Sequence, residues 1–272
     1  MRNKGTLKTW ARIGIAGVAF GCLGTVGPAA RAAEFSYSGD DGPGFWGELA
    51  SAWVNCSEDQ RQSPINIEQA VRDATLGPLD LALHATEIHL VNNGHTIEQE
   101  YQPGSTLTFE GVVYELQQFH FHTLSEHATN GERGVMELHA VFANAATDKL
   151  AVIGQIYELG EENAFLAAFD QLLPRHTNDL STSSTEINVA EGFKNTRAYY
   201  TYPGSLTTPP CSPTVTWIVL KRRVTLSEEQ FHLFNDILGN NFRPLQPLHD
   251  RTIRSSPASS GRCEQVVEDC GQ

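Results

Sequence analysis

The most constraining feature of this chain is a pair of predicted strands that together carry three histidines. Residues 112–122 are rich in β-forming side chains and predict a strand, in which alternate side chains share a face. His120 and His122 therefore point to the same side. Residues 135–143 predict a second strand, which carries His139. If the two strands are neighbours, three imidazoles converge on one point.

Polar residues beside these histidines suit the orientation of metal ligands. Gln118 shares the face of His120, and Glu137 shares the face of His139. Three neutral imidazoles are a typical ligand set for Zn²⁺ with a fourth position for water, and each ligand gives its other N–H to an acceptor. The alternative is that the histidines are ordinary polar residues on a solvated sheet face. Three of them together, with acceptors alongside, favour the metal site.

At these residues the chain resembles the α-class carbonic anhydrases. The matching segments run in family order over residues 35–251: Tyr37-Ser38-Gly39, Gln62–Ile67 (QSPINI), Asn92–His95 (NNGH), Gln118–His122 (QFHFH), Ser125–His127 (SEH), Glu137–His139 (ELH), Tyr202–Pro210 (YPGSLTTPP), Val215–Trp217 (VTW) and Arg243–Pro247. The resemblance implies a large, twisted, mostly antiparallel sheet with zinc at the bottom of a conical cleft. It also implies the reversible hydration of CO₂ to bicarbonate and a proton.

The resemblance assigns five residues to the zinc site: three ligands and two residues that orient the zinc-bound hydroxide. His120, His122 and His139 match the positions that bind Zn²⁺, which in carbonic anhydrases brings the pKa of bound water to about 7 and supplies hydroxide at neutral pH. Thr207 matches the hydroxyl that accepts a hydrogen bond from this hydroxide. Glu126 matches the buried carboxylate behind Thr207. Because an ionised carboxylate only accepts, the threonine must donate to it and is left as an acceptor.

An apolar pocket for CO₂ is implied by a further set of matches. These positions are Val141, Val152, Leu206 and Trp217. Thr208 matches a position that helps to place substrate or water. Packing in the core is the alternative role for the four apolar side chains, and for Trp217 the sequence does not separate the two.

The resemblance also implies a route for the proton. His95 matches the proton shuttle, and histidine suits this role because it titrates near neutral pH. Tyr37 and Asn92 match positions that order a chain of water molecules. Two positions depart from the family pattern: Glu98 stands where many bacterial members carry Gln, and Thr123 where many animal members carry Trp.

Residues 1–33 are typical of a secretory signal peptide. Basic residues precede an apolar run over residues 13–26, and small residues follow, with cleavage expected near Ala32 or Ala33. The run is shorter than the roughly 20 residues of a membrane span, although a retained anchor is the alternative. We therefore expect a periplasmic or secreted protein. Loss of five basic residues would take the formal net charge from −13 to −18.

The cysteines fit the same compartment. Without the predicted signal peptide four remain: Cys56, Cys211, Cys263 and Cys270. An even number in a secreted chain predicts disulfides, and four cysteines allow three pairings. The resemblance implies a bridge between Cys56 and Cys211, as in bacterial and some extracellular members of the family. Cys263 and Cys270 are then left to close a small loop.

The sequence predicts a single, mainly β domain with peripheral helices over residues 34–254, followed by a C-terminal extension over 255–272. Candidate strands are 87–91, 106–110, 112–122, 135–143, 150–157 and 214–224. Helical spacing predicts helices over 161–173 and 227–238. The second of these has Ser227 as its N-cap and Gln230 three residues later, a capping box.

The net charge and the motifs limit the partners and the functions that this chain is expected to have. An acidic chain is a poor match for nucleic acid or an anionic membrane, so the expected partner is a small molecule, CO₂ or bicarbonate. The oligomeric state, monomer or homodimer, is left open. The alternative function is a catalytically silent binding or adhesion module on the same fold. Such relatives typically lose a ligand histidine, whereas this chain keeps all three.

Overall fold

The structure is a computed structural model and describes residues 33–257. Apart from Ala33, the predicted signal peptide lies outside the described residues, as do Cys263 and Cys270. Within residues 33–257, no helix is both long and apolar enough to cross a membrane.

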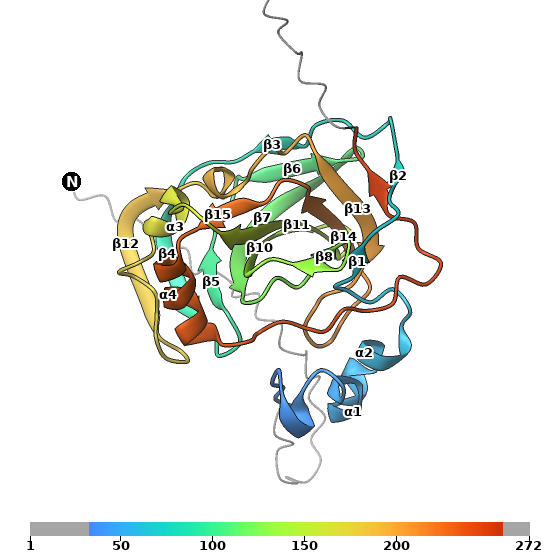
Figure 1. Ribbon diagram of the computed structural model, residues 1–272, viewed down its shortest axis with the longest axis horizontal. Helices are drawn as coiled ribbons and strands as arrows, with labels where there is room; N and C mark the ends of the chain where they lie inside the picture. Colours follow the sequence, from blue (N-terminus) through green and yellow to red (C-terminus); the bar gives the residue numbers. More distant parts are fainter. Residues whose placement is uncertain (1–32, 258–272) are drawn as a thin grey trace, which may run out of the picture. The chain divides into compact units, whose positions relative to one another are not determined.

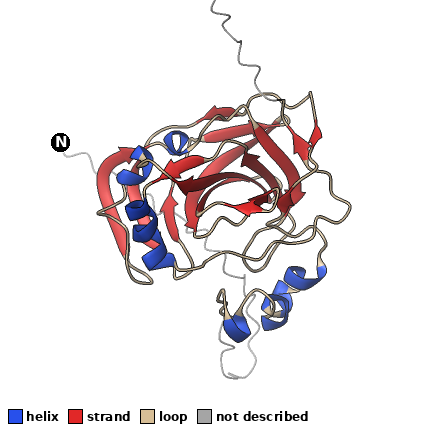
Figure 2. Ribbon diagram, viewed as in Figure 1, coloured by secondary structure: helices blue, strands red, loops and turns tan. Residues whose placement is uncertain are grey.

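A sheet of thirteen strands dominates the fold (Figures 1 and 2). Its main path is β12 (Leu180–Ile187), β4 (Thr86–Asn92), β5 (Ile97–Glu100), β7 (Val112–His122), β10 (Met136–Asn144), β11 (Lys149–Leu159), β14 (Val215–Leu220), β13 (Tyr199–Gly204), β16 (Arg254–Ser255) and β2 (Val71–Arg72). Beside this path, β15 (Val224–Leu226) pairs with β11, β6 (Thr106–Phe109) with β7, and β3 (Asp80–Ala82) with β6. Most pairs are antiparallel, so the predicted mainly β fold is confirmed.

The smaller elements lie outside this sheet. A second sheet joins β1 (Asn66–Ile67), β8 (Ala128–Thr129) and β9 (Glu132–Arg133). The described helices are η1 (Gly39–Asp41), α1 (Trp46–Leu49), η2 (Ser51–Trp53), α2 (Asn55–Glu58), α3 (Ala164–Ala167), η3 (Val189–Gly192) and α4 (Glu228–Leu238). The predicted capping box of α4 is present, with Ser227 and Gln230 bonded reciprocally. This second helix prediction is confirmed.

The centre of the large sheet is buried on both faces. Along β11, Ala151, Ile153 and Tyr157 belong to the larger apolar cluster, whereas Val152 and Ile156 belong to a second cluster. β11 runs parallel to β14 and β15, and strands in parallel pairing are usually covered on both sides, which explains its nearly continuous apolar sequence. The central strands therefore form a rigid base for side chains that project from them.

Two predicted elements differ from the structure. The helix predicted over 161–173 is reduced to α3, because Leu172 N–H bonds the Phe169 carbonyl in a tight turn instead of continuing an α-helix. Its apolar side chains are still buried, so their helical spacing correctly predicted a buried face but not the length of the helix. The strand predicted over 214–224 is two strands, β14 and β15, and both pair with β11.

The structure also contains strands that the pattern did not predict. β5 is short and lies between β4 and β7, and β12 is rich in Ser and Thr. At the other end, β16 pairs with β13 and β2, and the Ser256 N–H donates to the Tyr199 carbonyl. Ser255 therefore belongs to the sheet and Ser256 is bonded to it, although the predicted extension starts at 255.

Candidate metal centre

Three histidines meet on neighbouring strands at the middle of the large sheet. His120 and His122 project from β7, and His139 lies opposite His120 in the register of β10. The ring centroids are 4.6 to 5.4 Å apart. One nitrogen from each ring lies within 4.8 Å of the others, and His122 and His139 are almost completely buried. The predicted convergence is therefore present.

Each imidazole has one nitrogen bonded to an oxygen acceptor. His120 Nδ1 lies 2.8 Å from Gln118 Oε1, and His139 Nε2 lies 3.0 Å from Glu137 Oε1. His122 Nδ1 lies 2.7 Å from the main-chain oxygen of Asn241. Because these oxygens only accept, each of the bonded nitrogens carries the proton. The other nitrogen of each ring then keeps a lone pair directed toward the other two rings.

Burial favours the neutral form of two of these imidazoles. It lowers the pKa of His120 well below its usual value, and the neighbouring histidines lower it further. Burial also lowers the pKa of His122, although the charge of Glu126 acts in the opposite direction. Burial alone would raise the pKa of Glu137, but His127 and His139 hold it well below its usual range. Glu137 is therefore an ionised acceptor for the N–H of His139.

The unpaired atoms of the site fit a bound cation. Among residues 33–257, His122 Nε2 and Glu126 Oε2 are buried and have no hydrogen-bond partner. An unsatisfied buried nitrogen costs about 1–3 kcal/mol, and coordination to a metal ion would remove that cost. Three imidazole nitrogens with one open position match the ligand geometry of a reactive Zn²⁺ site better than a closed structural one.

A neighbouring group of possible ligands is a hydrogen-bonded chain instead. His127 Nδ1 lies 2.8 Å from Glu137 Oε1, and His127 Nε2 lies 2.7 Å from the Tyr202 hydroxyl. Both nitrogens of His127 are therefore engaged. The chain continues from Tyr202 to the Ser63 hydroxyl at 2.9 Å. It holds the Glu137 carboxylate, which in turn holds His139.

Glu126 lies beside the unbonded nitrogens of His122 and His139. Its Oε1 accepts the main-chain N–H of Arg243 at 2.7 Å, and its Oε2 lies 3.6 Å from His122 Nε2. In the part of the chain that the structure describes, no hydrogen bond joins Glu126 to Thr207, so the predicted pair is not formed here. Thr207 is nonetheless buried in the loop between β13 and β14.

Comparison with known proteins agrees with this site. A family model described as eukaryotic-type carbonic anhydrase matches residues 41–257. The chain belongs to the α-carbonic anhydrase family. A carbonic anhydrase of Pectobacterium atrosepticum is 37% identical over 226 residues, which cover 83% of this chain and 92% of the relative.

Solved structures extend the likeness to the fold. The α-carbonic anhydrase of Thermovibrio ammonificans, solved with the inhibitor sulfanilamide, has a TM-score of 0.79 and 36% identity, covering 82% of this chain and all of that chain. A dioscorin solved in complex with ascorbate has a TM-score of 0.77 and 30% identity, covering 84% of this chain and 99% of that chain.

The four apolar residues predicted to line a CO₂ pocket form a wall beside the histidines. Val141, Val152 and Trp217 lie opposite one another on β10, β11 and β14. They belong to, or pack against, the second apolar cluster together with Leu206. The Trp217 ring centroid is 4.7 Å from that of His139. Thr208 lies in the same loop as Leu206 and is half-buried.

His95, the predicted proton shuttle, lies in the turn between β4 and β5. Its ring stacks on Phe35, with centroids 3.9 Å apart and 9° between the planes. Burial lowers the pKa of His95, and the charge of Glu34 acts in the opposite direction. In this structure the imidazole is thus neutral at neutral pH and held against an aromatic face.

Two residues predicted to order water differ in their surroundings. Tyr37 packs edge-on against Phe35 and Trp46, and burial, with Glu126 adding to it, raises its pKa well above the usual value. Asn92 is buried, its amide nitrogen donates to the Pro174 carbonyl, and its oxygen accepts the Gly94 N–H. These two bonds hold the turn and use one of the two donors and one of the two lone pairs of the Asn92 amide, so its place in a water network stays a prediction.

The departure at Glu98 places a third acidic side chain, after Glu126 and Glu137, near the ligands. Glu98 lies opposite His120 in the pairing of β5 with β7. Burial, and then the charge of Glu100, raises the pKa of Glu98 to about 7. The sequence identified Glu98 as unusual, but the unpredicted strand β5 is what brings it beside a ligand.

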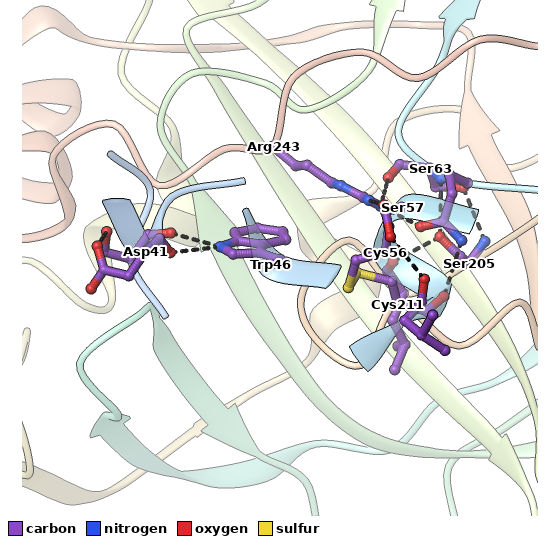
Figure 3. Close-up of a disulfide and its surroundings, with 12 residues drawn as sticks. Asp41, Trp46, Cys56, Ser57, Ser63, Ser205, Cys211 and Arg243 are labelled. Carbon is purple, nitrogen blue, oxygen red and sulfur yellow. Dashed lines mark hydrogen bonds between the residues drawn. A yellow bond between two sulfur atoms is a disulfide. The ribbon is translucent and has the colours of Figure 1, made fainter. Parts of the chain in front are cut away.

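The implied bridge between Cys56 and Cys211 is present (Figure 3). Arg243 donates to the Cys56 carbonyl at 2.8 Å, and Gln62 donates to the Cys211 carbonyl at 3.1 Å. The same guanidinium bonds Gln62 Oε1 at 2.7 Å. The disulfide is therefore part of a buried polar cluster that ends at Glu126 through the Arg243 main chain.

Three supporting residues were not identified as such from the sequence. Asn241 and Arg243 hold His122 and Glu126 from more than 100 positions away, so no local spacing signals them. Gly154 lies opposite His139, and a Cβ there would be 2.7 Å from Glu137 Oε1. A glycine inside an apolar strand is a sign of close approach, and that signal could have found Gly154.

Proposed function

We propose that this protein catalyses the reversible hydration of CO₂ to bicarbonate and a proton, with Zn²⁺ held by His120, His122 and His139. The observation that carries the proposal is the set of three convergent, neutral imidazoles whose bonded nitrogens leave one lone pair each for the metal. Membership of the α-carbonic anhydrase family supports it.

The ligand set explains the choice of metal chemistry. When bound by three neutral imidazoles, zinc keeps its full positive charge and supplies a hydroxide nucleophile at neutral pH, the behaviour known for carbonic anhydrases themselves. The tautomer of each ligand is held by Gln118, Glu137 and the Asn241 main chain, so the imidazoles need no reorganisation to bind.

Substrate selection is assigned to the apolar wall. CO₂ is small, linear and uncharged, and it gains by leaving water for an apolar surface. Val141, Val152, Leu206 and Trp217 offer such a surface next to His139. We assign Thr207 and Thr208 to the orientation of the reacting groups, with Glu126 as the acceptor for Thr207. The buried and unpaired Oε2 of Glu126 supports its part of this assignment.

Each turnover leaves a proton to be delivered to buffer, and we assign this transfer to His95. Its half-buried ring can exchange with solvent, and its lowered pKa favours rapid release of the proton to buffer. Tyr37 is kept as a residue of the water network. We assign Asn92 to the same network, because its bonds to Pro174 and Gly94 leave one donor and one lone pair of the amide for water.

The compartment follows from the disulfide. Disulfides persist in oxidising compartments, so the Cys56–Cys211 bridge supports a periplasmic or secreted protein. A predicted signal peptide over residues 1–33 agrees with this proposal.

The rival function is a binding module without catalysis. It is favoured by the likeness to dioscorin, which was solved with ascorbate. The complete set of three histidines favours the enzyme.

Stopped-flow CO₂ hydration by the mature protein, with zinc content measured on the same sample, separates the two functions. We expect fast hydration that disappears after chelation, returns with zinc and is lost in His120→Ala. Bound zinc at one ion per chain without hydration would favour the binding module. Normal hydration by a well-folded His120→Ala would exclude the proposed ligand set.

A further inference from the structure

Asn241 joins the turn that carries His95 to the end of β7, which carries His122. Asn241 is 1% exposed, and its main-chain oxygen accepts the Nδ1–H of His122 at 2.7 Å. Its Nδ2 donates to the main-chain oxygens of His95 and Phe121, each at 3.0 Å. Its Oδ1 accepts the N–H of Thr123 at 2.7 Å. All these side-chain polar atoms are used.

The bonds from Asn241 attach the turn that carries His95 to the end of β7, whereas the pairing of Asn92 with Ile97 attaches it only to its own hairpin. The pairing of β5 with β7 ends at Glu98 and His120, so the ladder does not reach the turn. Beyond it, the Thr96 hydroxyl donates to the Phe121 carbonyl at 2.7 Å, the same oxygen that Asn241 contacts. Thr96 and Asn241 therefore extend the attachment of this turn to the end of β7.

The chain around Asn241 alternates between the site and the surface. Asn241 and Arg243 are buried, whereas Asn240 and Pro244 are exposed and Phe242 is half-buried. An extended segment after α4 thus directs every second side chain inward. Asn240 has the same side chain as Asn241 on the opposite face, which makes it a matched control.

We propose that Asn241 is a positioning residue that couples the shuttle His95 to the metal ligand His122. One planar amide group fixes the distance between the His95 main chain and the end of β7, while the carbonyl of the same residue orients the His122 ring. A displacement of Asn241 must therefore change both. This inference rests on the proposed function, in which zinc binds at His122 and His95 transfers the proton.

The test is Asn241→Asp, which removes both N–H donors, keeps Oδ1, and turns a carboxylate toward the two carbonyls. We expect zinc to be lost to a chelator about tenfold faster, since residues that orient metal ligands typically change metal affinity by tenfold or more. In zinc-saturated protein at low buffer, we expect kcat about tenfold lower, because kcat includes proton delivery. Added imidazole should restore kcat, and kcat/KM, which covers only the steps to bicarbonate, should stay near the parent value.

Two further variants separate coupling from general damage. Asn240→Asp adds the same charge on the outer face and should change neither quantity. Thr96→Val removes the other bond to Phe121 without touching His122, so it should lower kcat, with recovery in imidazole, and leave zinc release unchanged. If Asn241→Asp does not fold by circular dichroism, Asn241→Ser removes the same two contacts without a charge and is measured in the same way.

The inference is overturned if Asn241→Asp changes only one of the two quantities, or neither, or if Asn240→Asp reproduces both effects. Failure of the proposed function looks different: zinc-loaded parent protein would then not hydrate CO₂ at all. In that case the metal-release measurement and the NMR signals of the His95 ring would test whether Asn241 couples the two histidines. Unchanged His95 signals in Asn241→Asp would overturn the coupling.

Discussion

At the scale of single residues, the chemistry of this site depends on which nitrogen of each imidazole carries the proton. His139 is bonded through Nε2, whereas His120 and His122 are bonded through Nδ1. The partners are a carboxylate, a side-chain amide and a main-chain carbonyl, and none of these oxygens can donate. The lone pairs that remain are directed inward, so the supporting residues matter as much as the ligands.

Gly154→Ala should weaken zinc binding without touching a ligand. The added Cβ would be 2.7 Å from Glu137 Oε1, the atom that holds His139. The carboxylate must move and lose its bonds to His127 and His139. We expect zinc affinity to fall by about tenfold or more, measured by competition with a chelator.

A glycine elsewhere serves as the control for this substitution. A Cβ on Gly77 would meet no atom within 4 Å, so Gly77→Ala should leave zinc affinity unchanged. Equal affinities for the two variants would show that Glu137 does not orient His139.

At the scale of elements, the helix and the sheet edges are held by local polar contacts that can be tested separately from the site. The N-terminus of α4 is closed by Ser227 and Gln230, and Gln230 also bonds the main chain of Asn163 ahead of α3. The edge formed by β16 and β2 is held by Arg254, which bonds Glu110 through both of its terminal nitrogens.

Ser227→Ala should lower the free energy of unfolding by about 1 kcal/mol, because the N–H of Gln230 loses its acceptor. Urea unfolding followed by circular dichroism measures this change. Ser227→Asp keeps an acceptor at the same position and should retain most of the stability. Equal losses in both variants would mean that the cap does not stabilise α4.

The Glu110 contact should make a small, pH-dependent contribution to stability. The hydrogen bond from Arg254 lowers the pKa of Glu110 below its ordinary value of 4.5. The folded protein therefore binds this proton less tightly than the unfolded chain, and the stabilisation is present at neutral pH and lost as the pH falls through the folded pKa. Because Glu110 is about half exposed, the contribution is at most about 1 kcal/mol.

Unfolding free energies of the parent and Glu110→Gln, measured from neutral to acidic pH, test this contribution. We expect the variant to be less stable at neutral pH and the difference to close below pH 4.5. Glu132→Gln changes an exposed acid on β9 and should follow the parent throughout. A difference for Glu110→Gln that widened toward acidic pH would contradict the sign of this pKa shift.

At the scale of the whole molecule, the site is held together by contacts between distant parts of the chain. The disulfide joins α2 to the loop that carries Thr207 across a separation of 155 residues. Arg243 contacts Cys56 and Ser63 (Figure 3). Its guanidinium also bonds Gln62, and its main chain bonds Glu126. The N-terminal segment, the loop between β13 and β14 and the chain after α4 therefore meet in one buried cluster.

Removal of the disulfide should lower the free energy of unfolding by about 4–5 kcal/mol, the loop-closure value for a loop of this length. The measurement is urea unfolding of the Cys56→Ser/Cys211→Ser double variant beside the oxidised parent. The reduced parent is the control and should match the double variant. A parent that loses no stability on reduction would show that the bridge does not stabilise the fold.

The sequence by itself determined those parts of this protein that depend on local periodicity. Alternation placed His120 and His122 on one face of β7 and Phe119 and Phe121 in the core. The capping box of Ser227 and Gln230, two residues close in sequence, likewise predicted the start of α4 directly after Ser227. The family motifs carried over the three histidines and the Cys56–Cys211 pairing.

Local alternation also predicted Gln118 and Glu137 as acceptors for their histidines, but only tertiary structure decided the supporting groups that are distant in sequence. His122 and Asn241 are 119 positions apart, and Glu126 and Arg243 are 117 positions apart, so no spacing along the chain predicts either contact. The helix expected over residues 161–173 is shorter because apolar residues at helical spacing can also be buried by turns. Local patterns decide which face a side chain takes, whereas the sheet order decides what that face meets.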